Sequence, residues 1–264
     1  MYRLAAISVM LLATSSLATS PAQAADEWGD LSLRIVYDSD RHPAAMSIST
    51  AAGTEFCGGL TTLKTDDLLV NPKDRGVANV FVYLQEDAGK FAIHADYASS
   101  AKKDAIMANK GCAFVPKAMT MRLTQTFVGT NPDPVGHNMK VDSFDNPSFN
   151  LAVPAGGKIT NTFKVVEPMP LKVTCTSHPW MAGLVLVRDD PYSAVSDASG
   201  KIKLVNLPVG KWKFRIWHER PGFIQKATIG SKANEWPRRP IEWDIKPGKN
   251  DLGDVLVKPA VFKE

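Results

Sequence analysis

Three side chains that can bind a soft metal ion lie within the seven residues from Cys175 to Met181. Cys175 offers a thiolate, His178 an imidazole and Met181 a thioether. Thiolates and imidazoles suit copper in both oxidation states, and a thioether at longer range favours Cu(I) over Cu(II). The stretch therefore indicates a copper site that still needs a second imidazole.

His137 is the upstream residue that can supply this second imidazole. It ends the run Asn131-Pro132-Asp133-Pro134-Val135-Gly136-His137, and the chain from there to Cys175 is long enough for several strands. One ligand from one loop and three from another predict a site at one end of a β-sandwich, where strand ends hold the ligands rigidly. Such rigidity keeps the reorganisation cost of electron transfer low.

Each of these residues also has a structural interpretation when it is considered alone. A single cysteine is more often an inert buried thiol, a single histidine a hydrogen-bonded side chain, and a single methionine part of a core. The conjunction of four ligands favours copper binding instead. The other histidines, His42, His94 and His218, have no ligand-like neighbours, so we expect them to be structural or exposed.

The chain has three cysteines, and Cys175 is the one with ligand-like neighbours. Cys57 and Cys112 are left as a candidate disulfide pair. The sequence does not show whether their Cα atoms come close enough to be bridged, so the pairing stays open.

The N-terminus has the layout of a secretory signal peptide. Arg3 precedes an apolar run over residues 4–12, and small residues follow up to Ala22-Gln23-Ala24. The apolar run is too short to span a bilayer, although an N-terminal membrane anchor is the alternative. We therefore expect residues 1–24 to be removed, the protein to be periplasmic or otherwise exported, and no membrane span to follow.

The charges exclude one class of partner. The chain has 31 Lys and Arg against 27 Asp and Glu, a formal net charge of +4. The basic residues are scattered rather than gathered in a stripe, so we expect no nucleic-acid partner.

The rest of the chain predicts an all-β protein. Short β-branched or alternating runs recur between turn residues, a pattern typical of sandwiches. The predicted strands cover residues 31–37, 77–84, 119–126, 138–141, 159–165, 171–174, 184–187, 202–205, 211–217 and 255–257. Residues 97–109 are the exception, because Ala, Lys and Met at helical spacing predict a short surface helix there.

The stretch with the ligands resembles the cupredoxins. Its Cys-x-x-His-x-x-Met loop, followed by Ala182-Gly183-Leu184-Val185-Leu186-Val187, is similar to their ligand loop, and Pro179 makes it most similar to amicyanin. Upstream, Phe114-x-Pro116, Asn131-x-Asp133 and His137-Asn138 resemble the first half of the plastocyanin-like pattern. The resemblance implies a Greek-key cupredoxin β-sandwich over residues 109–189.

The same resemblance assigns roles to the residues. It implies one type 1 (blue) copper ion, with Cys175, His137 and His178 as strong ligands and Met181 as the weak axial ligand. Asn138 would form a hydrogen bond to the ligand loop at Thr176 or Ser177. The candidate electron port is His178, with its ring edge at the surface between apolar Pro179 and Trp180.

The C-terminal segment resembles a second family. The runs Pro191–Asp197, Gly200–Ile202, Asn206–Lys211 and Phe214–Glu219 are similar to a carboxypeptidase regulatory-like, or transthyretin-like, β-sandwich. We expect residues 190–264 to form this sandwich, completed by an N-terminal β segment over residues 25–108. The cupredoxin would then be inserted into it, as in exported bacterial proteins of the methylamine utilisation type.

Two functions follow from these patterns. The first is single-electron transfer by Cu(I)/Cu(II) cycling between a redox donor and acceptor, such as a dehydrogenase or a cytochrome. The alternative is a cell-surface module that binds carbohydrate or protein, with a structural or vestigial copper site and tryptophans as stacking platforms. Catalysis is not expected, because a catalytic copper needs further histidines, commonly as His-x-His pairs, and the chain has none.

Overall fold

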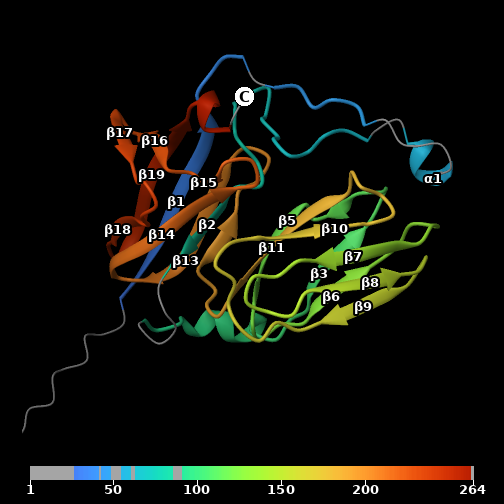
Figure 1. Cartoon of the computed structure of the whole chain (residues 1–264). Coiled ribbons are helices and arrows are strands. Elements are labelled where there is room, and N and C mark those ends of the chain that lie inside the picture. The colour runs from blue at the N-terminus through green and yellow to red at the C-terminus, as the bar shows by residue number, and fades with distance from the viewer. Residues whose placement is uncertain (1–26, 42, 49–54, 61–62, 86–90, 263–264) are drawn as a thin grey trace, which may run out of the picture.

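The computed structural model describes residues 27–41, 43–48, 55–60, 63–85 and 91–262, and this part of the chain is almost all β. The predicted signal peptide and His42 lie outside the described residues. No helix in the described part is long and apolar enough to cross a membrane. Figure 1 shows the strands gathered into two bodies, each built from two sheets.

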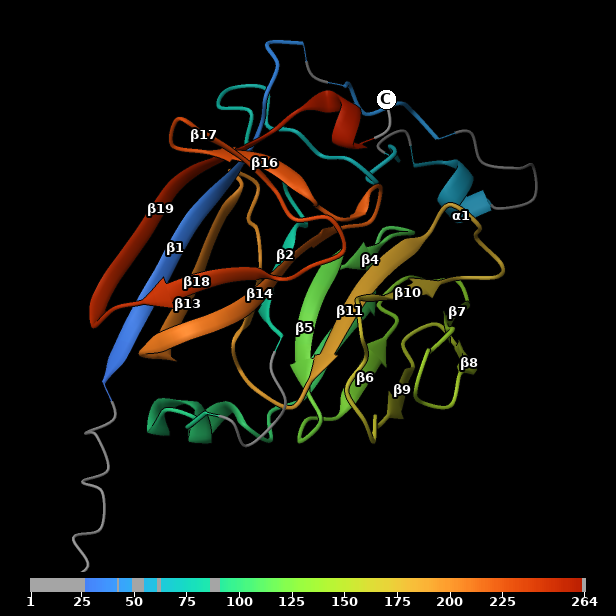
Figure 2. The ribbon, with the colours of Figure 1, turned by 60° about the vertical axis from the view of Figure 1, so that its left-hand side comes forward.

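The first body, the flanking sandwich, contains both ends of the described chain (Figure 2). One of its sheets has the order β13-β1-β19-β16-β17, and the other has β12-β2-β14-β15 with β18 paired to β14. Its strands are β1 (Trp28–Tyr37), β2 (Phe81–Leu84), β12 (Ser193–Val195), β13 (Lys201–Pro208), β14 (Gly210–His218), β15 (Gly222–Phe223), β16 (Lys226–Ile229), β17 (Lys232–Glu235), β18 (Ile241–Ile245) and β19 (Gly248–Val257).

Strand β1 shows why these residues form a sandwich. Its buried and half-buried side chains alternate from Trp28 onwards, which places Leu31, Leu33 and Ile35 on the core face. The described tryptophans of this body pack against the same core or, for Trp217, into the apolar cluster shared with the central sandwich, rather than forming an exposed platform. Trp217 is buried, and Trp212 and Trp243 pack half-buried against the core.

The second body, the central sandwich, contains the predicted ligands. Its sheets have the orders β5-β11-β10-β7-β8 and β4-β3-β6-β9. Its strands are β3 (Ala105–Asn109), β4 (Phe114–Val115), β5 (Ala118–Arg122), β6 (Phe127–Thr130), β7 (His137–Val141), β8 (Phe149–Val153), β9 (Lys158–Asn161), β10 (Leu171–Thr174) and β11 (Ala182–Arg188). The connections β6–β7, β8–β9 and β9–β10 cross between the two sheets, as in a Greek-key sandwich.

The chain runs from the flanking sandwich into the central one and back. β1 and β2 precede β3 to β11, and β12 to β19 follow them, so the first and last segments build one core together. One early segment departs from this division. The short helix α1 (Glu55–Gly58) brings Cys57 into the core of the central sandwich, and Leu63 packs there too.

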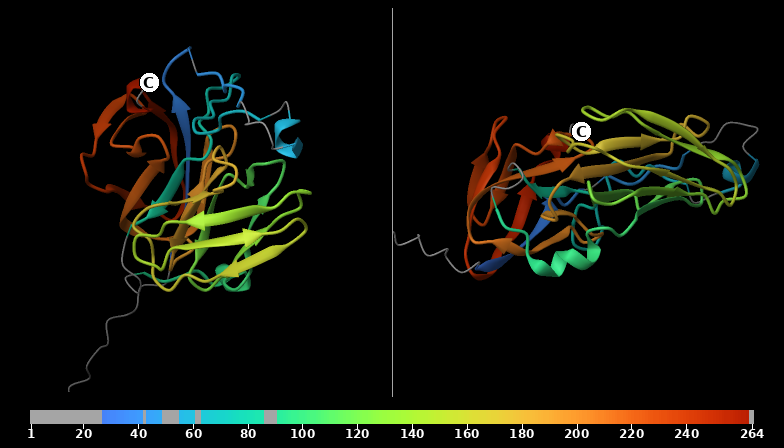
Figure 3. Two further views of the ribbon diagram at one scale, coloured as in Figure 1. Left: turned by 45° about the vertical axis from the view of Figure 1, so that its right-hand side comes forward. Right: turned by 90° about the horizontal axis from the view of Figure 1, so that it is seen from below.

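The two sandwiches lie side by side in both views of Figure 3. They share an apolar interface, to which β2 contributes from one body and β11 from the other. Phe81 and Tyr83 of β2 pack against Leu184 and Leu186 of β11. The Tyr83 hydroxyl also donates a hydrogen bond to the Pro168 carbonyl at 3.1 Å. The central sandwich is therefore held against its neighbour by side chains, not only by the linking chain.

The predicted helix over residues 97–109 was wrong. The 3-10 helix η1 covers Ala95–Ser100, and Ala105–Asn109 form strand β3 instead. Ala105, Met107 and Asn109 are buried on alternate positions, and the strand pairs with β4 and β6. The alternating burial of these residues is that of a strand, because every second side chain packs into the core of the central sandwich. A second 3-10 helix, η2 (Pro259–Phe262), closes the described chain.

Candidate metal centre

The predicted ligands meet because of how β7 pairs with β10. β7 begins at His137 and β10 ends at Thr174, and the two strands are antiparallel, with Thr174 opposite Lys140. The start of β7 and the end of β10 therefore lie at the same end of the sheet. Cys175 is the first residue after β10, and residues 175–181 form the loop from β10 to β11.

Three candidate ligand atoms converge at this end of the sheet. The Nδ1 atoms of His137 and His178 lie 3.0 Å apart, and the Cys175 Sγ lies 4.0 Å from the first and 3.5 Å from the second. All three residues are buried. Ligand nitrogens lie about 2.0 Å, and sulfurs about 2.3 Å, from an ion such as zinc, so atoms bound to one ion are at most about 4.3 Å apart. The donor set therefore fits a single soft metal ion.

Met181 ends the same loop and is 1% exposed. Its backbone closes the loop on both sides: its N–H donates to the His178 carbonyl at 2.9 Å, and its carbonyl accepts from the Cys175 N–H at 3.4 Å. These two bonds fold the loop over the three converging atoms. Met181 thus lies in the same core cluster as Cys175.

Asn138 braces the ligand loop from β7. Its Oδ1 accepts hydrogen bonds from the Thr176 N–H at 2.8 Å and from the Thr176 hydroxyl at 2.9 Å. Its own N–H points at the Cys175 Sγ at 3.5 Å. Of the two partners that the sequence left open, the Asn138 side chain pairs with Thr176, while the backbone N–H of Ser177 faces the Cys175 sulfur.

The surroundings of Cys175 favour the thiolate, which is the form that binds metals. Burial by itself raises the pKa of this thiol, but hydrogen bonds from His137 and from backbone N–H groups, including that of Asn138, outweigh burial and lower the pKa below its usual value. For His137, burial lowers the pKa, but its hydrogen bonds to Cys175 and Asp133 raise it above the usual value. Burial and the neighbouring His137 lower the pKa of His178.

The candidate electron port is largely covered. His178 is 6% exposed, whereas Pro179 is exposed and Trp180 is half-buried. The Trp180 ring meets the His178 ring edge-on, with 5.3 Å between the ring centroids. The other described histidines lie elsewhere: His94 caps η1 through its Nδ1, and His218 is buried in the flanking sandwich.

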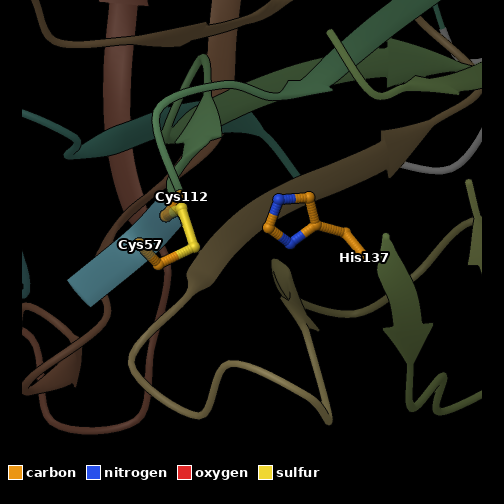
Figure 4. Close-up of side chains that lie close together, drawn as sticks. All are labelled: Cys57, Cys112 and His137. Atoms are coloured by element: carbon orange, nitrogen blue, oxygen red, sulfur yellow. A yellow bond between two sulfur atoms is a disulfide. The ribbon is translucent and has the colours of Figure 1, made fainter. Parts of the chain in front are cut away.

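Cys57 and Cys112 form a disulfide, with 5.7 Å between their Cα atoms, and Cys175 is free. Figure 4 shows this disulfide beside the ring of His137. A ring nitrogen of His137 and the two sulfur atoms lie within 4.8 Å of one another. This disulfide therefore borders the candidate metal centre.

Sequence reasoning missed the function of Asp133. Its Oδ2 accepts a hydrogen bond from His137 Nε2 at 3.0 Å, which leaves Nδ1 directed at Cys175 and His178. Its own N–H donates to Asn131 Oδ1 at 3.1 Å, a turn that the Asn-Pro-Asp run could have indicated. The contact with His137 had no sequence signal, because residues four apart meet predictably only on a helix.

No protein-family model matches the chain, and no curated protein matches it. Solved structures do resemble part of it. Cupredoxins are among them. A purple cupredoxin from Nitrosopumilus maritimus is 25% identical over 32% of this chain and 99% of that chain, with a TM-score of 0.27.

Two further neighbours are described as copper-containing. A Cu(I) form of an amicyanin variant is 16% identical over 32% of this chain and 82% of that chain, with a TM-score of 0.29. The Cu-containing nitrite reductase from Thermus scotoductus SA-01 is 21% identical over 32% of this chain, with a TM-score of 0.29, and the match spans 22% of that enzyme. Other amicyanin variants match over 40% of this chain and 98% of theirs, with TM-scores of 0.29.

Proposed function

We propose that this protein binds one type 1 copper ion through His137, Cys175, His178 and Met181 and carries single electrons by Cu(I)/Cu(II) cycling. The observation that carries the proposal is the convergence of one thiolate and two imidazole nitrogens, 3.0 to 4.0 Å apart, in a buried site. Bound copper would supply the one-electron chemistry. Two imidazoles, a thiolate and a weak thioether are the donor set of blue-copper electron-transfer sites.

The chain's own residues hold these donors in one arrangement. Asn138 ties the ligand loop to β7 through Thr176, and Asp133 fixes the ring of His137. Both contacts lie outside the donor set, so they persist whichever charge the metal carries. A site that cannot relax between oxidation states suits electron transfer, because little reorganisation accompanies each electron.

The proposal includes a path for the electron and a place for the protein. His178 would pass electrons to the surface beside Pro179 and Trp180, towards a donor and an acceptor such as a dehydrogenase or a cytochrome. The signal-like residues 1–24 would direct the protein to the periplasm or another exported location. The flanking sandwich would be the carboxypeptidase regulatory-like unit, with the copper domain inserted into it.

We propose electron carriage rather than catalysis. In the part of the chain that the structure describes, the second group of metal-binding residue types combines His137 with Cys57 and Cys112, whose sulfurs are joined in the disulfide. A separate catalytic copper would need a donor set of its own. His94 and His218 serve as a helix cap and a core side chain instead.

Loading the purified mature protein with Cu(II) tests this function. We expect one equivalent of copper, an intense visible thiolate-to-copper band, and reversible loss of the band on reduction. Cys175→Ser should abolish the band. His178→Ala should weaken copper binding, whereas His94→Ala, at the N-cap of η1, should leave it unchanged. A wild-type protein that stays colourless and retains no copper would contradict the proposal.

A further inference from the structure

The Cys57–Cys112 disulfide anchors a tight turn beside the metal centre. Residues 110–113 connect β3 to β4, and Gly111 and Cys112 are the two central residues of this turn. The Lys110 N–H donates to the Ala113 carbonyl at 2.9 Å. Both central residues have positive φ, 62° for Gly111 and 55° for Cys112. This conformation suits glycine but costs on the order of 1 kcal/mol for a residue with a side chain. The turn therefore needs other contacts to hold Cys112 in place.

One set of contacts joins this turn to His137. The backbone N–H groups of Gly111 and Cys112 donate to the two carboxylate oxygens of Asp133 at 2.7 and 2.9 Å. The same carboxylate accepts the His137 Nε2–H at 3.0 Å, and Asp133 is only 5% exposed. Three donors from two segments thus fix one buried carboxylate. The position of the turn decides where that carboxylate holds the His137 ring.

A second contact joins the turn to His178. The Trp180 indole N–H donates to the Cys112 carbonyl at 3.2 Å, and the indole ring packs edge-on against the His178 ring. Cys112, Trp180 and Met181 also line one small cavity of about 20 Å³. The backbone of a single residue, Cys112, therefore contacts the supports of both imidazoles.

We propose that the Cys57–Cys112 disulfide positions both imidazole ligands, through Asp133 on one side and Trp180 on the other, and thereby sets the metal's preference for Cu(II) over Cu(I). This inference rests on the proposed copper function. Asp133 is a positioning residue, since it touches His137 and not the metal. Its negative charge and its hydrogen bond make the His137 imidazole a stronger donor, which stabilises Cu(II) more than Cu(I).

The loss of the disulfide should therefore act on the copper from a distance. Without the bridge, the turn can leave the positive-φ conformation at Cys112, and both N–H donors then move away from Asp133. The carboxylate is held less firmly against His137, so Cu(II) loses more stabilisation than Cu(I). The reduction potential should rise.

A double-mutant cycle tests this coupling. The cycle compares the wild type, Cys57→Ser/Cys112→Ser, Asp133→Asn, and the variant with all three changes, by redox titration and by the electron paramagnetic resonance spectrum of Cu(II). We expect Asp133→Asn to lower the affinity for Cu(II) relative to Cu(I) about 10-fold to 100-fold, which raises the potential by about 60 to 120 mV. The cysteine variant should shift the potential in the same direction. The combined shift should be smaller than the two single shifts together, because both act through one carboxylate.

Two tryptophan variants test the second path without touching the disulfide. Trp180→Phe keeps an aromatic ring but removes the N–H that reaches Cys112, and should change the copper spectrum and the potential. Trp212→Phe is the matched control, because its indole N–H donates to the Pro208 carbonyl at 2.7 Å in the flanking sandwich. This control should leave both readouts unchanged.

The outcomes separate this inference from the function on which it rests. A wild-type protein that binds no copper overturns the proposed function. The inference alone is overturned if the wild type shows the blue band and the cysteine variant folds with the same potential and the same spectrum as the wild type. Fully additive shifts would show that the disulfide does not act through Asp133. If the cysteine variant does not fold, unchanged potentials in both Asp133→Asn and Trp180→Phe would still overturn the inference.

Discussion

The side-chain oxygen of Asn138 accepts two hydrogen bonds from Thr176, one from its backbone N–H at 2.8 Å and one from its hydroxyl at 2.9 Å. Asn138 follows His137 in β7, and Thr176 follows Cys175 in the ligand loop. The pair therefore joins the two segments that supply the proposed metal ligands, one residue away from a proposed ligand on each side.

Replacing Asn138 with Ala should loosen this junction. The two hydrogen bonds from Thr176 are lost, together with the one from the Cys175 thiol and the one from the Asn138 amide to Asn150. The free energy of unfolding of the metal-free protein should therefore fall by about 1 to 2 kcal/mol, and the visible band of the copper form should broaden. Asn150→Ala is the matched control, because it removes the hydrogen bond from the Asn138 amide to exposed Asn150 and leaves the two bonds from Thr176 in place. Its cost should stay below about 0.5 kcal/mol. Equal effects of the two changes in urea denaturation would argue against the brace.

Met181→Leu should keep the blue colour but raise the reduction potential. The thiolate that gives the colour stays in place, whereas loss of the thioether further disfavours Cu(II). Met121→Leu is the matched control, since Met121 is a buried methionine of the same core. Potentiometric titration of both variants measures the effect. An unchanged potential in Met181→Leu would show that its sulfur does not coordinate the metal.

His218 should make the protein sensitive to acid. Its burial in the flanking sandwich lowers its pKa to about 4, against about 6.5 in an unfolded chain. The folded state binds fewer protons, so the contribution of His218 to stability is complete above about pH 6.5 and is lost as the pH falls towards 4. We expect the free energy of unfolding of the wild type to fall by about 3 kcal/mol relative to that of His218→Gln over this pH range.

Asp190 changes the stability of the folded state with pH in the opposite direction, because burial raises its pKa to about 6. It is present in both proteins, so its contribution cancels from the difference between wild type and His218→Gln. Urea denaturation at several pH values measures this difference. Parallel stability curves for the two proteins would contradict the assignment to His218.

Lys117 and Glu219 form a largely covered ion pair between the two sandwiches, and Lys117 also bridges Asp66 at 2.8 Å. The charged atoms of Lys117 and Glu219 lie 3.2 Å apart, with side chains 10% and 11% exposed, and burial raises the pKa of Glu219. Lys117→Met leaves this carboxylate without its partner and should cost about 3 kcal/mol of stability, whereas Lys117→Met/Glu219→Gln should recover part of the loss.

Lys203→Met is the control for the ion pair between the sandwiches. Its bridge to Asp30 is exposed, so its removal should cost less than about 1 kcal/mol in the same denaturation experiment. Equal costs for the two lysine changes would show that burial adds nothing to the pair at the interface.

Strands that are determined by local sequence patterns were predicted from the sequence. The strand over residues 171–174 has the same bounds in the structure as in the prediction, because its alternation and flanking turns are local. The prediction over residues 97–109 failed, because alanines and methionines fit a helix equally well and only pairing with β6 fixes the period of two. The strand predicted over residues 159–165 likewise ends at Asn161, where its pairing with β6 ends.

The sequence by itself determined the candidate donors of one loop, because the spacing of Cys175, His178 and Met181 is local to the chain. It also indicated His137 as the second imidazole. Only the tertiary structure decided how these donors are held. The pairing of β7 with β10 brings His137 to Cys175, and the disulfide turn at Cys112 reaches Asp133 and Trp180 through backbone groups. Every residue except proline carries the same backbone N–H and carbonyl groups, so the pattern of side chains did not predict those contacts.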